Sequence, residues 1–142
     1  MKKIISILTI TLAVLLLAGC MPGQPIAAVP GATPLADMPD TPPGLVAPEI
    51  RSGIQLSYFK APGAISVMSA AIAGDMNAFA GQYVQDIDNY VVSTVQFLGN
   101  IGLLISGEAA VYAIVPYGDY LVIVSGTGND VILFLDEFTV AS

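Results

Sequence analysis

Tyr120-Leu121-Val122-Ile123-Val124-Ser125 is the stretch that most restricts the fold of this chain, because it holds four consecutive apolar residues within the length of one strand. A strand with one solvated face alternates apolar and polar residues, so an unbroken apolar run predicts a strand covered on both faces. The run Val131 to Leu135 has the same character. We therefore expect a central sheet with apolar packing against each side.

The residues around this stretch predict an antiparallel β-meander. Glycines and Asn129 in the intervening segments suit the positive φ of tight turns, so consecutive hairpins are expected. The predicted strands are 101–106, 110–115, 120–125 and 131–140. The predicted turns are Gly107-Glu108, Pro116-Tyr117-Gly118-Asp119 and Gly126-Thr127-Gly128-Asn129-Asp130.

Upstream of the meander the spacing predicts one strand and then helix. Ile54, Leu56 and Tyr58 alternate with polar residues, which is typical of a strand. From about residue 66 the apolar residues fall three or four apart, which predicts an amphipathic helix ending near residue 98, either long or broken near Gly74. Gly99-Asn100 is the predicted stop signal for that helix.

The predicted fold class is therefore α+β over residues 50–142: one N-terminal strand, one long or broken amphipathic helix, and a meander of three to four strands. One helix covers only one face of a sheet. The second face is thus expected to meet the N-terminal strand, another subunit, a partner protein or lipid.

The N-terminus has the layout of a secretory signal. Lys2 and Lys3 precede fifteen mostly apolar residues, Ile4 to Ala18, and small residues then lead to Cys20, the only cysteine. Fifteen helical residues span about 22 Å, less than the roughly 30 Å of bilayer hydrocarbon. The segment is therefore predicted to be a signal and not a membrane span.

Leu17-Ala18-Gly19-Cys20 resembles the lipobox of bacterial lipoprotein precursors. The resemblance implies that residues 1–19 are removed, that the Cys20 thiol is diacylglycerated, and that two or three acyl chains hold the protein to the extracytoplasmic side of a membrane. Met21 is not aspartate. In a diderm source the resemblance then favours the outer membrane.

Residues 20–49 are predicted to be a lipidated cysteine followed by an extended tether. Eight prolines lie between Pro22 and Pro48, with no apolar periodicity. The pairs Pro22/Pro25 and Pro39/Pro42 have PxxP spacing without a flanking basic residue, so a spacer is favoured over a proline-rich ligand.

Charge and composition exclude several kinds of chemistry. Removal of the signal takes Lys2 and Lys3 and changes the net charge from −7 to −9, which excludes nucleic acid as a partner. The chain has no histidine and no tryptophan, and acylation of Cys20 leaves no thiol for a disulfide or a metal site. We expect no cofactor and no metal.

Short motifs carry little catalytic signal. Ser57-Tyr58-Phe59-Lys60 matches S-x-x-K, but in a strand residues three apart point to opposite faces. Gly126-Thr127-Gly128 lacks the third glycine and the lysine of a phosphate loop and is expected between two strands. The acids Glu108 and Asp136 have no companion that spacing alone can identify.

Tyr117 and Tyr120 flank a predicted turn, where exposed aromatic side chains suit a partner-binding site. The favoured function is a non-enzymatic envelope module that binds a protein partner or itself through the uncovered apolar face of the sheet. The alternative is a carrier for an apolar ligand, which the 55% hydrophobic composition serves equally well. An enzyme comes third.

Overall fold

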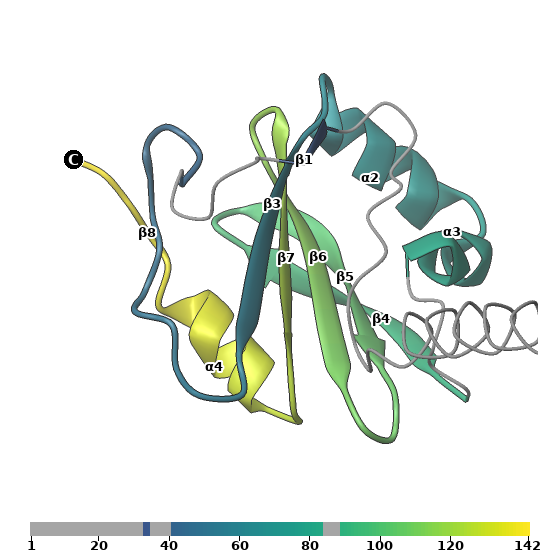
Figure 1. The fold of residues 1–142 in the computed structure, drawn as a ribbon. Helices are drawn as coiled ribbons and strands as arrows, with labels where there is room; N and C mark the ends of the chain where they lie inside the picture. Colours follow the sequence, from purple (N-terminus) through teal and green to yellow (C-terminus); the bar gives the residue numbers. More distant parts are fainter. Residues whose placement is uncertain (1–32, 35–40, 84–88) are drawn as a thin grey trace, which may run out of the picture.

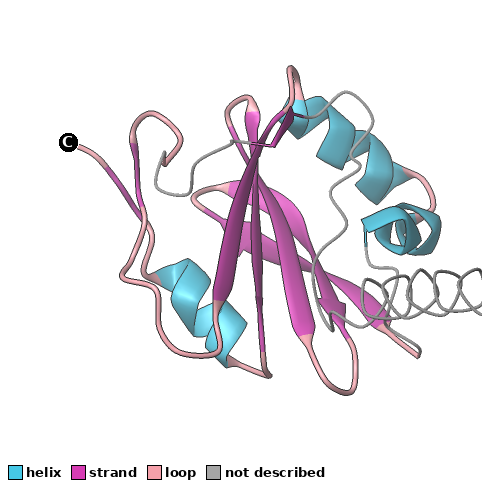
Figure 2. Cartoon of the chain, viewed as in Figure 1, coloured by secondary structure: helices cyan, strands magenta, loops and turns pink. Residues whose placement is uncertain are grey.

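The computed structural model describes residues 33–34, 41–83 and 89–142. In chain order the elements are β1 (Thr33–Pro34), β2 (Leu45–Val46), β3 (Gln55–Lys60), α2 (Ala64–Ala73), α3 (Met76–Tyr83), β4 (Val91–Phe97), β5 (Asn100–Ser106), β6 (Val111–Tyr117), β7 (Tyr120–Gly126), α4 (Asp130–Asp136) and β8 (Thr139–Val140). Helices lie on both sides of a sheet (Figures 1 and 2). The predicted α+β class is confirmed.

Six strands form one antiparallel sheet in the order β1-β3-β7-β6-β5-β4, and β2 pairs with β8 in a separate two-stranded sheet. Strands β4 to β7 are a meander of neighbours. β3 pairs with β7 along its whole length, from Gln55 opposite Ser125 to Lys60 opposite Tyr120. This long-range pairing places the N-terminal strands beyond the last strand of the meander and leaves β4 at the opposite end.

One face of the sheet is covered by α2 and α3. α2 follows Gly63, whose φ of 71° suits glycine, and it buries Ala64, Met68 and Ala71, which share one side of the helix. The Asp75 carboxylate begins α3 by accepting hydrogen bonds from the backbone N–H groups of residues 77 and 78, at 3.0 and 3.1 Å. The sheet contributes these buried residues to the same core: Phe59, Leu103, Ile105, Tyr112, Ile114, Leu121 and Ile123.

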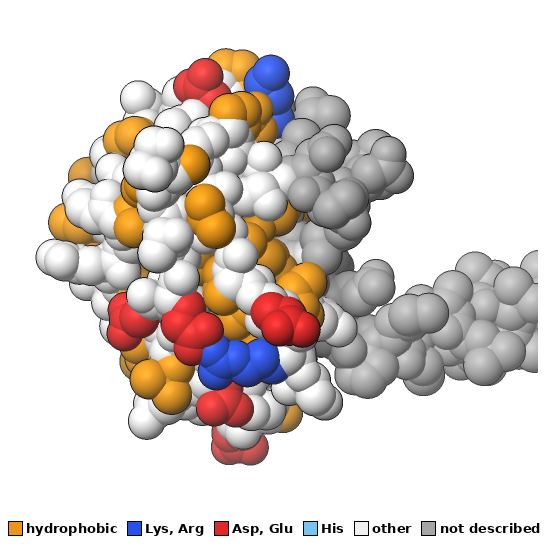
Figure 3. Space-filling view, turned by 90° about the vertical axis from the view of Figure 1, so that its left-hand side faces the viewer, with side chains coloured by type: hydrophobic (Ala, Val, Ile, Leu, Met, Phe, Trp, Pro, Cys, Tyr) orange, Lys and Arg blue, Asp and Glu red, His pale blue; other side chains and the backbone are white. Residues whose placement is uncertain are grey.

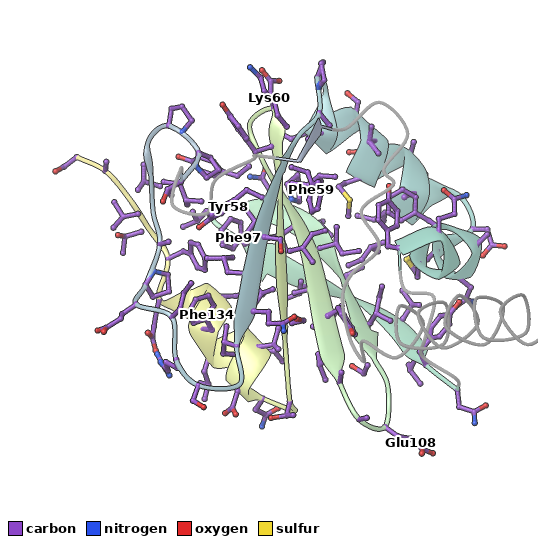
Figure 4. All side chains as sticks on the ribbon, viewed as in Figure 1. Tyr58, Phe59, Lys60, Phe97, Glu108 and Phe134 are labelled. Carbon is purple, nitrogen blue, oxygen red and sulfur yellow. The ribbon has the colours of Figure 1, made fainter. Side chains whose placement is uncertain are left out.

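The other face is covered by α4 and by the segment that carries β2. α4 buries Val131, Phe134 and Leu135, and Leu45 is only 5% exposed. Figure 4 shows Phe134 on the α4 side of the sheet and Phe59 on the α2 side. Both faces are therefore covered by this chain itself. The strand expected to fold over the second face is β3 and lies in the sheet, and α4 with the β2 segment takes the place that was also open to a subunit, a partner or lipid.

The missing cover came from a segment predicted as a strand. Residues 131–140 were expected to be the last strand of the meander, but residues 130–136 form α4 and only Thr139–Val140 is extended. A short apolar run fits a buried helix and a buried strand equally well. Asn129 and Asp130, which suit a turn, are equally compatible with the N-terminus of α4.

The long predicted helix is also corrected. The helix is broken near Gly74, which is one of the two predicted forms. The Gly74 N–H donates a hydrogen bond to the Ala70 carbonyl at 2.9 Å. The second helix is described to Tyr83, and Val91–Phe97 is the strand β4. In residues 91–97 the apolar residues have helical spacing, but many of the residues are β-branched and favour a strand. Pairing with β5 stabilises the strand.

Folded structure begins before residue 50. Thr33–Pro34 pairs with β3, and Leu45–Val46 pairs with β8, so the segment predicted as a tether contributes two short strands. The prediction of a single N-terminal strand is wrong for this reason.

Candidate functional site

The outer edge of β4 is the longest open strand edge in the described part of the chain. β4 ends the six-stranded sheet, and only β5 pairs with it among the described residues. Ser93, Thr94 and Gln96 are exposed, and Val91 is 67% exposed. A strand at this position presents a row of backbone N–H and C=O groups to any strand that approaches.

The turn between β4 and β5 determines the direction of these backbone groups. Leu98 and Gly99 both have positive φ, 46° and 82°, as in the type I′ turn of a two-residue hairpin. Phe97 lies opposite Asn100 at the base of the turn. In such a hairpin these flanking residues exchange both backbone hydrogen bonds.

Hydrogen-bonded and non-hydrogen-bonded pairs alternate along an antiparallel ladder. Starting from Phe97, the odd-numbered residues of β4 therefore direct their N–H and C=O groups to β5. The even-numbered residues Val92, Thr94 and Gln96 direct theirs away from the sheet. The open edge thus offers three donors and three acceptors in a fixed array.

The side chains of β4 do not obstruct pairing. The strand reads Val-Val-Ser-Thr-Val-Gln-Phe and contains no charged residue, no proline and no glycine. Proteins usually protect a strand edge with lysine, proline, a bulge or a covering segment. No such side chain is present along these seven residues.

An apolar groove lies beside the same hairpin, between α2 and the start of β5. Its volume is about 380 Å³, and its apolar lining includes Ile65, Ile72, Ile101 and Pro116. Ile65 and Ile72 are seven residues apart and share one side of α2. Ile65 and Ile101 remain 44% and 50% exposed, so the groove adds apolar surface next to the open edge.

Leu98 adds strain to the hairpin tip. A leucine at positive φ is costly because its side chain crowds the backbone, and glycine, asparagine or aspartate is the usual residue there. Leu98 is also 40% exposed. A strained, exposed apolar residue next to the groove is consistent with a contact site.

A second depression, of about 390 Å³, lies at the start of β3 and β6 and the end of β7, around Gly53, Ala109 and Thr127. Its lining carries no acid, lysine or arginine. Neither Glu108 nor Asp136 lines either of these two cavities. Figure 4 shows Glu108 at the tip of the β5–β6 turn, where Glu108 and Ala109 are both exposed.

The surface over α4, β2 and β8 is mixed. Arg51 pairs with Glu137, and this hydrogen bond and charge, together with Asp130, raise the pKa of Arg51. Figure 3 shows acidic side chains gathered around a basic one on this face, with apolar side chains scattered between polar ones. β2 and β8 have two residues each, too few for a pairing edge comparable with β4.

Tyr117 and Tyr120 flank the β6–β7 turn, as the sequence predicts. They are cross-strand neighbours on the α4 side and are half-buried. The Tyr117 ring packs edge-on against Phe97 at 6.5 Å, and the Tyr117 hydroxyl lies close to Gly44. Tyr117 is therefore engaged within the fold and offers little free ring surface. Cys20, the predicted lipidation site, lies outside the described residues.

Two tyrosines in the core have raised pKa values. Burial raises the pKa of Tyr83 to about 12, and its hydroxyl has no hydrogen-bond partner among the described residues. Burial also raises the pKa of Tyr58, against a smaller lowering by its hydrogen bond with Thr41. Both groups stay neutral at physiological pH, and neither lines the groove or the second depression.

The S-x-x-K match in β3 and the Gly126-Thr127-Gly128 segment do not have the geometry of the catalytic or phosphate-binding motifs that they resemble. Ser57 and Lys60 lie in β3 and face opposite sides of the sheet. Gly126-Thr127-Gly128 joins a strand to a helix, so the expectation of two flanking strands is wrong. The first turn of α4 carries Asp130, whose charge opposes phosphate.

No group of three or more acidic, histidine or cysteine side chains converges to hold a metal within the described residues. Among those residues, no helix combines the length and apolar character needed to cross a bilayer. The edge of β4 and its adjoining groove are thus the leading candidate site. The spacing of apolar residues predicts a helix over Val91–Phe97 and therefore gives no sign of this edge. Comparisons with protein-family models, curated proteins and solved structures found no match to this chain.

Proposed function

We propose that this chain is a lipid-anchored extracytoplasmic envelope protein that acts as a non-enzymatic interaction module, docking a protein strand against β4. The observation that carries the proposal is the open edge of β4: seven uncharged residues, largely exposed, at the end of a rigid sheet. An added strand gains backbone hydrogen bonds at Val92, Thr94 and Gln96.

Anchoring rests on the N-terminal sequence. The lipobox resemblance ending at Cys20 supports attachment through acyl chains, and in a diderm source Met21 favours the outer membrane. The charge of −9 that remains after signal removal repels anionic lipid surfaces, so attachment depends on the lipid and not on protein charge.

A non-enzymatic role fits the distribution of reactive groups. The exposed acids Glu108 and Asp136 line neither of the two described cavities. The two core tyrosines with raised pKa values, Tyr58 and Tyr83, also line neither cavity. General acid–base and nucleophilic catalysis both need paired groups within hydrogen-bond reach.

Site-specific photo-crosslinking in the native envelope tests the docking surface. A photoreactive amino acid replaces Thr94 at the edge, and the matched control replaces Thr127, an exposed threonine in the β7–α4 loop. We expect a discrete protein adduct from position 94 and none from position 127. Absence of an adduct at position 94, or equal adducts at both positions, contradicts the proposal.

The Cys20→Ala variant tests the anchor. It should lose acyl incorporation and leave the membrane fraction, while the parent chain stays membrane-bound. Retention of the variant in the membrane fraction contradicts lipid anchoring through Cys20.

A second candidate, binding of an apolar ligand, is favoured by the groove beside α2. Its volume of about 380 Å³ lies within the range of small-molecule sites. Native mass spectrometry of the full chain should then show a retained lipid that the Ile72→Asp variant loses and the Thr94→Lys variant keeps. A parent chain without any retained ligand contradicts this candidate.

A further inference from the structure

We infer that the strand docked against β4 is β4 of a second copy of this chain, antiparallel and centred on Thr94. This inference rests on the proposed function and specifies its partner. It follows from three properties of the edge: the spacing of its outward backbone groups, its side chains, and its sheet position.

The backbone groups are self-complementary. The outward residues Val92, Thr94 and Gln96 are symmetric about Thr94, so an antiparallel copy places Thr94 opposite Thr94 and Val92 opposite Gln96. These are the residues whose N–H and C=O groups point away from β5, so the facing pairs Thr94–Thr94 and Val92–Gln96 are hydrogen-bonded pairs in this register. A register shifted by one residue would oppose outward groups with inward ones.

The side chains match in the same register. Val91, which is 67% exposed in the single chain, lies opposite Phe97 of the second copy on the α4 side. Ser93 lies opposite Val95. No like charges meet, because the strand is uncharged, and Glu108 of each copy lies toward an outer end of the contact, since Val91 is the end of β4 opposite Ser106.

The sheet position is compatible with closed symmetry. Pairing of the same edge in two copies is an isologous contact that joins two six-stranded sheets into one and closes after two copies. The other end of each sheet is β1, which pairs with β3. The assembly therefore stops at a dimer.

The lipid anchor favours this contact. One pair of seven-residue strands is a small interface compared with the roughly 1,600 Å² of a standard stable complex. Confinement of both copies to one membrane raises their effective concentration and compensates for a weak contact. We therefore expect the dimer in the membrane, and dissociation on dilution in detergent.

Cysteine cross-linking of the full chain in membranes tests the register. In the Thr94→Cys variant the two new cysteines face each other across a hydrogen-bonded pair, with Cα atoms about 5.5 Å apart, within disulfide range. We expect mild oxidation to give at least about tenfold more covalent dimer than the parent chain, whose only cysteine is Cys20.

Two neighbouring variants are matched controls. Ser93→Cys and Val95→Cys alone place their cysteines two residues out of register, beyond the roughly 7 Å limit for a disulfide. Each alone should stay at the parent level, whereas the two variants co-expressed should cross-link. Equal or stronger cross-linking of either single variant overturns the Thr94-centred register, and parent-level cross-linking of Thr94→Cys overturns the dimer.

The two proposals fail differently. If Thr94→Cys gives no dimer but the photoreactive residue at position 94 attaches to a different protein, the dimer is wrong and the interaction module stands. If neither gives an adduct, both are wrong.

Discussion

The two ends of the central sheet differ in how they meet solvent. At one end, β3 has buried residues at Leu56, Tyr58 and Phe59. Its last two residues pair with β1, and it finishes at the charged Lys60, followed by Pro62. At the other end, β4 is mostly exposed and carries neither charge nor proline. Among the described residues, protective features are therefore concentrated at the β3 end of the sheet, which is the contrast on which the proposed docking at β4 rests.

Proline substitutions distinguish the residues of β4 that bond β5 from those that point outward, and they should change the free energy of unfolding most. Ser93→Pro removes an N–H that bonds β5 and leaves a carbonyl unsatisfied, so the free energy of unfolding should fall by at least about 2 kcal/mol. Thr94→Pro removes an outward N–H and should change the free energy of unfolding by less than about 1 kcal/mol, while suppressing chemical cross-linking of the dimer in membranes. Denaturant unfolding in detergent, followed by circular dichroism, measures both. Equal destabilisation by the two variants would contradict the assignment of outward and inward groups.

The helix layer behind β4 gives a pH-dependent prediction. Tyr83 in α3 shares a core with Val92, and burial raises its pKa from 10 to about 12. Between these values the unfolded chain loses the Tyr83 proton and the folded chain keeps it, so folded stability should fall as pH rises from about 10 toward 12.

Tyr83→Phe removes this contribution. The variant should be as stable as the parent at neutral pH, or more stable by up to about 1 kcal/mol, because a buried hydroxyl without a partner among the described residues is removed. Its stability should decline less steeply with pH above 10 in thermal melts. Identical pH profiles for parent and variant would contradict burial of this hydroxyl.

The hairpin tip that carries the open edge should become more stable when its strain is relieved. Leu98→Asn places a residue that tolerates positive φ in the type I′ turn, so we expect a gain of about 0.5–1 kcal/mol. Gly99→Ala, at φ 82°, should lose a similar amount and is the matched control. If Leu98→Asn destabilises the fold, Leu98 is held by packing and not strained by the turn.

The smallest changes in the free energy of unfolding are expected when a lysine is added to the edge of β4 and when the lysine of β3 is removed. Thr94→Lys and Lys60→Val alter exposed side chains and should each change the free energy of unfolding by less than about 0.5 kcal/mol. Thr94→Lys should nevertheless suppress dimer formation, whereas Lys60→Val should not create a new contact. Association unaffected by Thr94→Lys, measured by chemical cross-linking in membranes, would contradict a docking role for β4.

The central strands were predictable from sequence because turn residues mark their ends. Predicted strands 101–106, 110–115 and 120–125 differ from β5, β6 and β7 by at most two residues at any boundary. α4 and β4 were not predictable in the same way, because Val131 to Leu135 and Val91 to Phe97 each fit two periodicities, and only the sheet around them decides between helix and strand.

The candidate site was beyond the reach of the sequence for a different reason. Whether a strand lies at an edge depends on the order of strands in the sheet, and that order is set here by the long-range pairing of β3 with β7. The burial of Tyr117 likewise depends on Phe97 and Gly44, which are distant in the chain. The four β-branched residues Val91, Val92, Thr94 and Val95 are the local signal for β4.

Amide hydrogen exchange within β4 tests the central claim most directly, because each strand residue reports its own side. In the membrane-anchored full chain, the amides of Val92, Thr94 and Gln96 should gain protection as the surface density of the protein increases. The amides of Ser93 and Val95, which bond β5, should be protected at every density and serve as internal controls. Rapid exchange at Val92, Thr94 and Gln96 at every density, with Ser93 and Val95 still protected, would show that the edge of β4 stays unpaired and would contradict the account.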